Sequence, residues 1–256
     1  MSDYCNKQSY PLRHSDLDFC DELKPSAILS LAQESAGKSA DELGFGQKSL
    51  KKRGCGFIIV NTYCKLISPV KVEEILTVET WPLPPRHVIF ERDYRISGSD
   101  GRICAVAASR WCLVDTQDFS LLTADRLSDV HENCPYRNEK TVEVPNWKIP
   151  KLNGEGYECY RMQVKNSHCD HYLHANNTRY ADFFFDCFTI EELRTRRIDS
   201  FHIVYGKQAR ENVELTFYRK DFPDGTTVIE ARSGAEVFSQ FRVQFKDRAE
   251  GERCAE

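Results

Sequence analysis

The sequence predicts an α+β protein made of two similar units, in each of which an antiparallel sheet wraps around one long central helix. Two observations support this fold class. Related segments occur in both halves of the chain, where Ser15 matches Ser167 and Asp18 matches Asp170 at one constant offset. After each segment the apolar spacing changes from helical to strand-like. Each copy is therefore expected to contain a strand, a helix and then about four antiparallel strands.

The helix of each unit is predicted from apolar residues that recur at intervals of three and four, which places them on one face. The first helix is expected to begin at Pro25, because proline suits an opening helical position. Both helices should be substantially buried. The apolar positions are Ile28, Leu31, Ala32, Ser35, Ala36 and Leu43 in the first helix, and Tyr180, Phe183, Phe184, Cys187 and Phe188 in the second.

Short runs rich in β-branched and aromatic residues predict the strands that follow each helix. They lie within 57–67, 73–81 and 88–115 in the first half, and within 200–209, 211–222 and 226–247 in the second. The pairs Asp100-Gly101 and Ser233-Gly234 supply the backbone freedom that tight turns need.

The chain is predicted to divide at a segment rich in proline and glycine. Residues 131–156 include Pro135, Pro145, Pro150, Gly154 and Gly156, and we interpret them as a linker. Residues 1–130 then form the N-terminal unit, and residues 157–256 form the C-terminal unit.

The composition favours a folded cytoplasmic protein. The chain has 256 residues, of which 41% are hydrophobic and 29% charged, with a net charge of −4. This charge gives no general attraction to nucleic acid or to anionic lipid, so neither is an expected partner. The N-terminus lacks the pattern of an export signal, and no apolar run is long enough to span a membrane. Eleven cysteines without any C-x-x-C spacing are interpreted as mostly buried free thiols.

Polar side chains concentrate in residues 168–180, "HCDHYLHANNTRY", directly before the second predicted helix. Metal binding is one interpretation, because His, Cys and Asp are all potential ligands. On a strand, however, His168 and Asp170 face one way while Cys169 and His171 face the other. No C-x-x-C or H-E-x-x-H motif supplies further ligands, so no metal site is expected.

The same segment resembles the active-site segment of the plant and bacterial acyl-acyl-carrier-protein (acyl-ACP) thioesterases, through Asp170, His174, Asn176-Asn177 and Tyr180. The first half resembles this family in residues 30–44, 78–96 and 109–115, which include Trp81, Arg92 and Trp111. The similarity extends over roughly residues 8–247. It implies a tandem, or double, hotdog fold in which each sheet wraps one long central helix.

The resemblance implies roles for six residues. His174 is expected to act in acid–base chemistry or to orient water, and Asp170 to act as base or to hold the imidazole. The remaining candidates are Tyr172, Asn176 and Asn177 in substrate binding or helix capping, and Gln208 as a catalytic residue that holds water.

Three positions depart from the family pattern. Tyr172 stands where Asp-x-Asn-x-His-x-Asn-Asn has its first Asn, and Gln208 stands where a catalytic Glu is usual. Glutamine can hold water but cannot accept its proton, so the base would be Asp170 or His174. Ala209 takes the place of the cysteine of the plant enzymes, and Cys169 is expected to point away from Asp170, so no covalent intermediate is expected.

The predicted function is therefore hydrolysis of fatty acyl-ACP to free fatty acid and holo-ACP, which ends chain elongation, with water as nucleophile and without a cofactor. Two alternatives stay open: a non-catalytic or weakly active acyl-binding protein, favoured by Tyr172 and Gln208, and an acyl-CoA thioesterase. The expected partner is the acidic acyl carrier protein, and the basic runs Arg194–Arg197 and Lys51–Arg53 are candidate docking sites. The fused unit is expected to be a monomer or to pair again as a homodimer.

Overall fold

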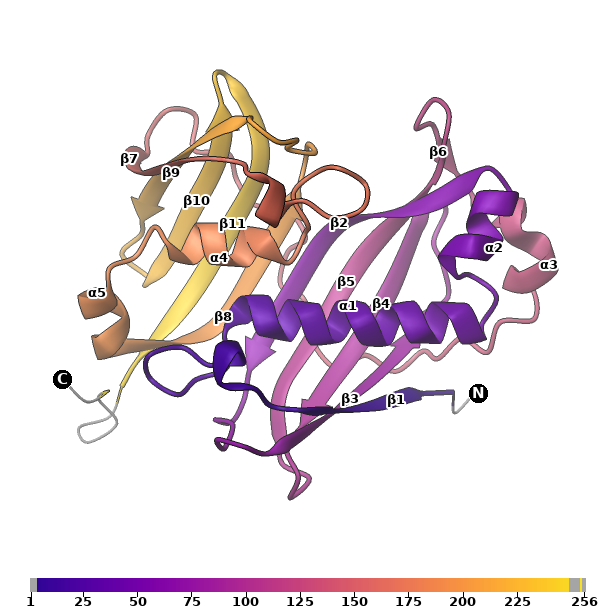
Figure 1. Cartoon of the computed structure of the whole chain (residues 1–256), viewed down its shortest axis with the longest axis horizontal. Helices are drawn as coiled ribbons and strands as arrows, with labels where there is room; N and C mark the ends of the chain where they lie inside the picture. Colours follow the sequence, from indigo (N-terminus) through magenta and orange to yellow (C-terminus); the bar gives the residue numbers. More distant parts are fainter. Residues whose placement is uncertain (1–3, 249–253, 255–256) are drawn as a thin grey trace. The chain divides into compact units, whose positions relative to one another are not determined.

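The computed structural model of the chain describes residues 4–248 and residue 254. The chain forms two compact units, whose elements are labelled in Figure 1. The first comprises Met1–His14, Leu29–Thr62 and Ile67–Val144, and the second comprises Ser15–Ile28, Tyr63–Leu66 and Pro145–Glu256. Residues 15–28 therefore pack with the C-terminal half of the chain, although they precede most of the first unit in sequence.

The sheet of the first unit is formed by β1 (Asn6–Pro11), β2 (Cys55–Leu66), β3 (Ile75–Pro82), β4 (Ile89–Ser97), β5 (Ile103–Asp115) and the short β6 (Leu121–Leu122). The order is β1-β3-β4-β5-β2, and β6 pairs with β5. The pairs β1–β3, β3–β4, β4–β5 and β5–β6 are all antiparallel. Alternate residues such as Leu76 and Val78 are fully buried, which is the two-residue period of a sheet with one face on a core.

Helix α1 (Pro25–Glu42) begins at the predicted proline and, from Leu29 on, lies across the strands of the first unit (Figure 1). Its contacts with them include polar ones. Ser35 and Ser39 are fully buried, and the Tyr10 hydroxyl lies 3.0 Å from the Ser35 hydroxyl oxygen. Arg92 donates a hydrogen bond of 2.9 Å to Ser39. Small side chains let the helix approach the sheet closely, and the hydroxyls satisfy the buried polar groups there.

Short helices close one end of this unit. Phe45, Leu50 and Leu113 form part of a buried cluster between them and the sheet. The helices at this end are α2 (Gln47–Lys52), η2 (Ala124–Leu127) and α3 (Ser128–His131), whereas the short η1 (His14–Asp16) precedes α1 in the chain.

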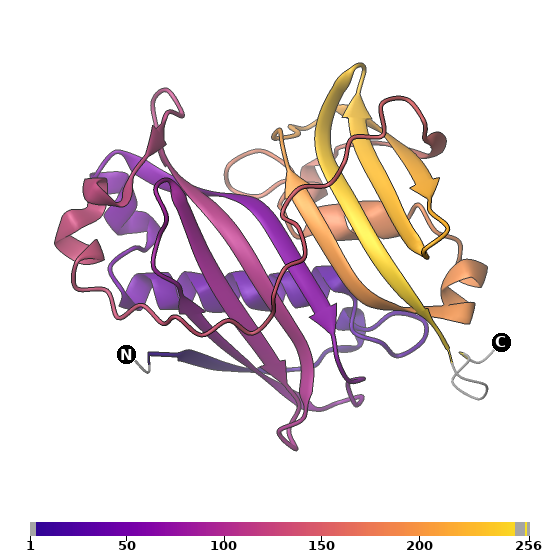
Figure 2. The ribbon, with the colours of Figure 1, turned by 180° about the vertical axis from the view of Figure 1, so that it is seen from behind.

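The segment 137–141 crosses the strands of the first unit on the face opposite to α1 (Figure 2). The Trp81 indole donates to the carbonyl oxygen of Glu139 at 2.8 Å, and Asp93 accepts hydrogen bonds from the amide and hydroxyl of Thr141. Burial raises the pKa of Asp93 to about 6, and the hydrogen bonds from Thr141 oppose this shift. This start of the predicted linker is thus bound to the sheet.

The strands of the second unit are β7 (Tyr157–Gln163), β8 (Arg196–Tyr205), β9 (Glu214–Asp221), β10 (Thr226–Ser233) and β11 (Glu236–Asp247). Their order is β8-β11-β10-β9-β7, and every neighbouring pair is antiparallel. Strand β7 therefore lies at the edge of this sheet. Both units carry the predicted antiparallel strands.

The helix of the second unit is much shorter than predicted. Helix α4 (Arg179–Phe185) has only 7 residues, and a separate helix α5 (Ile190–Thr195) follows η3 (Asn166–His168) and α4 in the chain. Thr189 and Glu192 form a capping box in which each side chain accepts the other's backbone N–H. This cap starts a new helix in a new direction, so the apolar spacing through Cys187 and Phe188 does not belong to one long helix. The prediction of a long central helix in this unit was wrong.

Helix α4 lies across the strands of its unit (Figure 1), and its contacts with them include aromatic rings. The ring of Phe184 stacks on that of Phe241 with centroids 4.9 Å apart, and it meets Phe217 edge-on at 5.6 Å. Phe184, Phe217 and Phe241 are fully buried. Aromatic pairs in these geometries add to the stabilisation from area burial, so a 7-residue helix is anchored firmly.

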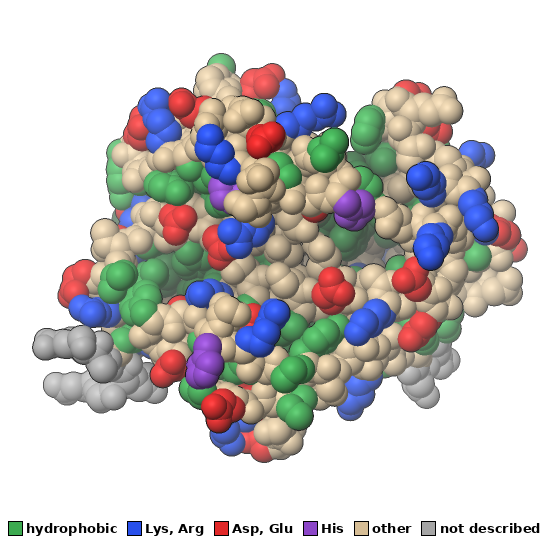
Figure 3. Space-filling view, viewed as in Figure 1, with side chains coloured by type: hydrophobic (Ala, Val, Ile, Leu, Met, Phe, Trp, Pro, Cys, Tyr) green, Lys and Arg blue, Asp and Glu red, His purple; other side chains and the backbone are tan. Residues whose placement is uncertain are grey.

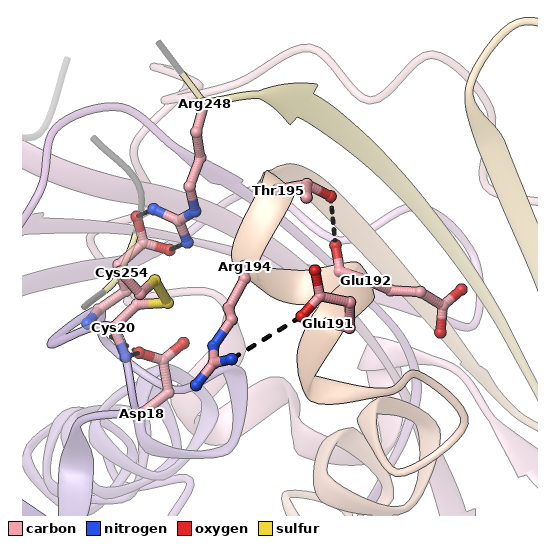
Figure 4. Close-up of a disulfide and its surroundings, with 9 residues drawn as sticks. Asp18, Cys20, Glu191, Glu192, Arg194, Thr195, Arg248 and Cys254 are labelled. Atoms are coloured by element: carbon pink, nitrogen blue, oxygen red, sulfur yellow. Dashed lines mark hydrogen bonds and ion pairs between the residues drawn. A yellow bond between two sulfur atoms is a disulfide. The ribbon is translucent and has the colours of Figure 1, made fainter. Parts of the chain in front are cut away.

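One pair of cysteines is disulfide-bonded. Cys20 is joined to Cys254, beside the bidentate ion pair of Arg248 with Glu22 (Figure 4). The other nine cysteines are free in the described part of the chain, and five of them are buried. The interpretation as mostly buried thiols therefore fails for this pair.

Among the described residues, no helix is both long and apolar enough to cross a membrane.

Candidate active site

Residues 169–175 fold back on themselves as a tight hairpin in front of α4. Cys169 and Ala175 form an isolated antiparallel bridge, and the Asp170 N–H donates to the carbonyl oxygen of His174 at 3.0 Å. Leu173 closes the turn with a left-handed φ of 64°. Residues directly opposite in an antiparallel pair project from the same face. Asp170 and His174 are therefore on one face of the hairpin, and Cys169 is on the other.

Asp170 is half-buried, and one of its carboxylate oxygens takes part in a hydrogen bond within the turn. Its Oδ1 accepts a hydrogen bond of 2.8 Å from the backbone N–H of Tyr172. This bond is an Asx turn, which fixes the side chain relative to the hairpin. A carboxylate has a second oxygen with free acceptor capacity, so the turn leaves Oδ2 able to bind a further donor.

The imidazole of His174 is half-buried and lies parallel to the ring of Tyr172. The ring centroids are 6.0 Å apart and the planes are inclined by only 11°. Tyr172 itself is 56% exposed, so it forms the solvent side of this stack. The tyrosine thus supplies a flat surface against the histidine, at the position where the family pattern has an amide.

The two asparagines stabilise the entrance to α4 in different ways. Asn176 Oδ1 accepts hydrogen bonds of 2.9 Å from both the amide and the hydroxyl of Thr178, which is the N-cap residue of the helix. The carbonyl oxygen of Asn177 accepts a hydrogen bond of 3.3 Å from the Tyr205 hydroxyl. Sequence reasoning did not identify Tyr205, although the alternation of β8 placed it on the same side as the buried Phe201 and Ile203.

Gln208 lies on the segment next to this hairpin. The Ala175 N–H donates to the carbonyl oxygen of Ala209 at 2.7 Å, and His174 forms an isolated antiparallel bridge with Arg210. The side chain of Gln208 is exposed. The structure therefore brings the segments of all six predicted site residues together, from parts of the sequence that are more than thirty residues apart.

His168, another candidate metal ligand of this segment, makes structural contacts. The Lys165 N–H donates to His168 Nδ1 at 3.1 Å, and the His168 ring meets Phe183 edge-on at 5.0 Å. Burial, with a smaller effect of Arg179, lowers the pKa of His168. Within residues 4–248 and at 254, no three His, Cys, Asp or Glu side chains form a group that could hold a metal ion.

Comparison with known protein families gives two matches that together cover most of the chain. The acyl-ACP thioesterase N-terminal domain matches residues 3–126, and the acyl-ACP thioesterase C-terminal domain matches residues 153–255. The chain belongs to the acyl-ACP thioesterase family. The resemblance inferred from the sequence is thereby confirmed, and this acyl-ACP thioesterase is a thioester hydrolase.

Solved structures show the same fold as this thioesterase. An acyl-ACP thioesterase from Bacteroides thetaiotaomicron is 21% identical with a TM-score of 0.84, covering 94% of this chain and 98% of that chain. A 12:0-ACP thioesterase from Umbellularia californica is 17% identical with a TM-score of 0.85, covering 95% of this chain and 98% of that one. At such identities the likeness is one of fold. No curated protein matched the sequence significantly.

Proposed function

We propose that this thioesterase hydrolyses fatty acyl-ACP to free fatty acid and holo-ACP by direct attack of water, with Asp170 and His174 as the catalytic residues. The observation that supports this most is the hairpin register, since a carboxylate and an imidazole opposite each other in an antiparallel pair have Cβ atoms about 5 Å apart. Both side chains are half-buried, so they combine access to substrate with partial shielding from water.

In the proposed reaction Asp170 acts as general base. It accepts a proton from water through Oδ2 while the water oxygen attacks the thioester carbonyl carbon. His174 donates a proton to the sulfur of the departing carrier thiol. The Asx turn holds Asp170 in place, and the ring of Tyr172 restricts the rotation of the imidazole. Cys169 projects from the opposite face of the hairpin, so it is not proposed as a nucleophile.

The remaining site residues are proposed to bind and position. Tyr172 contacts substrate at the entrance of the site, and Asn176 and Asn177 shape the backbone before α4 so that substrate can approach it. Gln208 is proposed to hold the attacking water by hydrogen bonds from the neighbouring segment. None of these roles requires a cofactor.

At the level of the whole chain, we propose a double hotdog with an N-terminal hotdog at residues 1–130, a linker at 131–156 and a C-terminal hotdog at 157–256 that carries the site. The packing of α1 and of α4 on antiparallel strands supports this. On the face viewed in Figure 3, basic and acidic side chains are interspersed. Such a surface suits a cytoplasmic enzyme that ends fatty acid elongation.

For carrier docking, exposed Lys51 and Lys52 at the end of α2 are better candidates than Arg194–Arg197. Arg196 pairs with Glu192, and its guanidinium carbon lies 4.2 Å from the ring centroid of Phe245. A guanidinium held in this way contributes to packing, whereas exposed lysines remain available to an acidic partner.

The test is release of free thiol by the purified full chain, measured over a series of acyl chain lengths on acyl carrier protein and on CoA. Hydrolysis of acyl-ACP at a higher kcat/KM than of acyl-CoA is expected. A preference for acyl-CoA would replace the proposed carrier. Binding without turnover of either would favour the acyl-binding alternative, for which the tyrosine at 172 and the exposed glutamine at 208 are the specific observations.

A further inference from the structure

Two free cysteines of the second unit come into contact at the edge of the sheet, although neither belongs to the proposed site. Cys159 lies on edge strand β7, and Cys187 lies two residues after the last residue of α4. The two side chains lie within interaction distance of each other, and the Cys187 thiol donates to the carbonyl oxygen of Phe183 at 3.6 Å. The side chains of the neighbouring residues Tyr160 and Asp186 interact too, so the strand and the segment after the helix meet through two adjacent residues on each side.

The position of Cys159 results from an irregularity in the strand. The register of β7 against β9 shifts between Glu158 and Tyr160, which pair with Tyr218 and Phe217. Cys159 is the extra residue of this β-bulge. Because a bulge re-aims the side chain that it inserts, the thiol of Cys159 is directed differently from a regular strand residue. Its sulfur lies 3.4 Å from the carbonyl oxygen of Phe217.

The surroundings make the two thiols chemically unequal. The interaction with Cys187 lowers the pKa of Cys159, and the positive charge of Arg219 lowers it further against the effect of burial. The interaction with Cys159 and its own burial both raise the pKa of Cys187. Arg219 also donates to the carbonyl oxygen of Cys187 at 3.1 Å, so its guanidinium lies beside the pair. Cys159 is half-buried, whereas Cys187 is only 6% exposed.

We propose that Cys159 and Cys187 form a reversible dithiol–disulfide pair that is oxidised by small-molecule disulfides such as oxidised glutathione. The thiolate of Cys159 attacks one sulfur of the oxidant, breaks its S–S bond and releases one molecule of thiol. Cys187 then loses its proton and attacks the Cys159 sulfur of the mixed disulfide, releasing the second thiol. Two electrons pass from the protein dithiol to the oxidant, which is reduced to two thiols.

The bond would have a structural consequence for the enzyme. It would join edge strand β7 to the end of α4 and close a loop that contains Asp170, His174 and both asparagines. Closing such a loop reduces the conformational freedom of the chain within it. The pair is thus a redox modification site that restrains the segment of the candidate active site.

The experiment uses the full chain in buffers with graded ratios of reduced to oxidised glutathione. Samples are quenched in acid, free thiols are alkylated, and the digested chain is mapped by mass spectrometry. We expect Cys159 and Cys187 to lose alkylation in parallel, with a linked peptide that contains both residues. In Cys187→Ser, Cys159 should instead carry glutathione. Cys169→Ser is the matched control, since Cys169 is also half-buried and lies in the same loop, and it should leave the linked peptide unchanged.

Hydrogen exchange of the wild-type chain gives a second measurement that does not depend on any variant folding. Oxidation should slow the exchange of amides within residues 160–186 by about tenfold relative to the reduced chain. The proposal is overturned if Cys159 and Cys187 stay fully alkylated where Cys20–Cys254 is oxidised. It is equally overturned if wild-type Cys159 accumulates as a glutathione adduct, or if the linked peptide contains Cys169. None of these results depends on thioesterase activity.

Discussion

Two hairpins of the second unit, 17–23 and 169–175, have the same backbone but carry different side chains. In each, an aspartate N–H donates to the carbonyl oxygen four residues later, at 2.8 Å for Asp18 and 3.0 Å for Asp170. Each aspartate also accepts a hydrogen bond of 2.8 Å from the N–H two residues on. Both hairpins have an isolated bridge between their ends. Both also have a left-handed residue, Asp21 or Leu173, directly before the residue opposite the aspartate. The backbone conformation of the hairpin therefore has a structural role that both copies share.

The difference lies at the position opposite the aspartate. In the first hairpin it is Glu22, which is held in a bidentate ion pair with both contacts to Arg248 at 2.8 Å. Cys20 of the same turn is bonded to Cys254 (Figure 4). In the second hairpin the equivalent position is His174, which stacks on an exposed ring and is not fixed by an ion pair in the described structure. The first hairpin is therefore bound to Arg248 and Cys254, whereas the second presents the imidazole for which we propose a catalytic role.

The largest expected effect is a loss of activity at His174, which lies opposite Asp170, and not at Glu22, which lies opposite Asp18. His174→Ala should lower kcat at least about a hundredfold, because proton donation to the leaving thiol is lost. Its counterpart Glu22→Ala should leave kcat almost unchanged but lower the free energy of unfolding by about 1–3 kcal/mol, since a partly buried guanidinium loses its partner. Thiol release and urea denaturation measure the two quantities. Normal turnover in a folded His174→Ala would end the catalytic assignment.

Removal of the disulfide should affect stability alone. Cys20→Ser is expected to lower the free energy of unfolding by about 2–4 kcal/mol, because the bond closes a loop with a sequence separation of 234 residues. Urea denaturation of the wild type under reducing conditions should reproduce this change, while kcat with acyl-ACP stays constant. A loss of kcat comparable with that of His174→Ala would show that the first hairpin also serves the reaction.

The paired aspartates should differ in function although they share a structural role. Asp170→Asn retains an oxygen that can accept the N–H of Tyr172, so the turn should survive while the base is lost. We expect kcat to fall about tenfold or more. Asp18→Asn should keep wild-type kcat. Equal turnover in wild type and Asp170→Asn would leave Asp170 with only its turn-forming role.

The pH dependence of stability gives a smaller effect at Asp18. Burial raises the pKa of this carboxyl, the charge of Glu22 raises it further, and hydrogen bonds from backbone N–H groups oppose the shift. A raised pKa in the folded chain means that the stabilisation is complete below the unfolded pKa and is lost as the pH rises through the folded pKa. Asp18→Asn lacks this loss, so it should be more stable than the wild type at pH 7. Unfolding midpoints between pH 3 and pH 7 would test the difference, and identical profiles would contradict it.

The smallest expected effect concerns the neighbouring segment. Gln208→Glu supplies a second carboxylate near the hairpin and should raise kcat by roughly threefold, because a carboxylate can accept the proton that glutamine cannot. Gln208→Ala is the control for loss of the side chain, and it should lower kcat slightly. A decrease in kcat in both variants would mean that the amide is required as it stands.

The sequence by itself determined the local features of this protein. The match of Asp18 with Asp170 predicted two related segments, and both fold as the same hairpin because an aspartate that accepts a hydrogen bond two residues on needs only its own neighbours. Pro25 marked the start of α1, and the strand periods located both sets of antiparallel strands. These features depend on interactions between residues close in the chain.

Only the tertiary structure decided which long-range contacts each of the two hairpins makes. Spacing could not reveal that Cys20 would meet Cys254, or that Arg248 would hold Glu22, because such pairs are created by packing between distant segments. Likewise, the helical period through Phe188 did not reveal that α4 ends at Phe185 and that a capping box at Thr189 and Glu192 begins a separate helix. Long-range contacts in this chain thus fixed one hairpin as an anchor and left the other free to carry an imidazole.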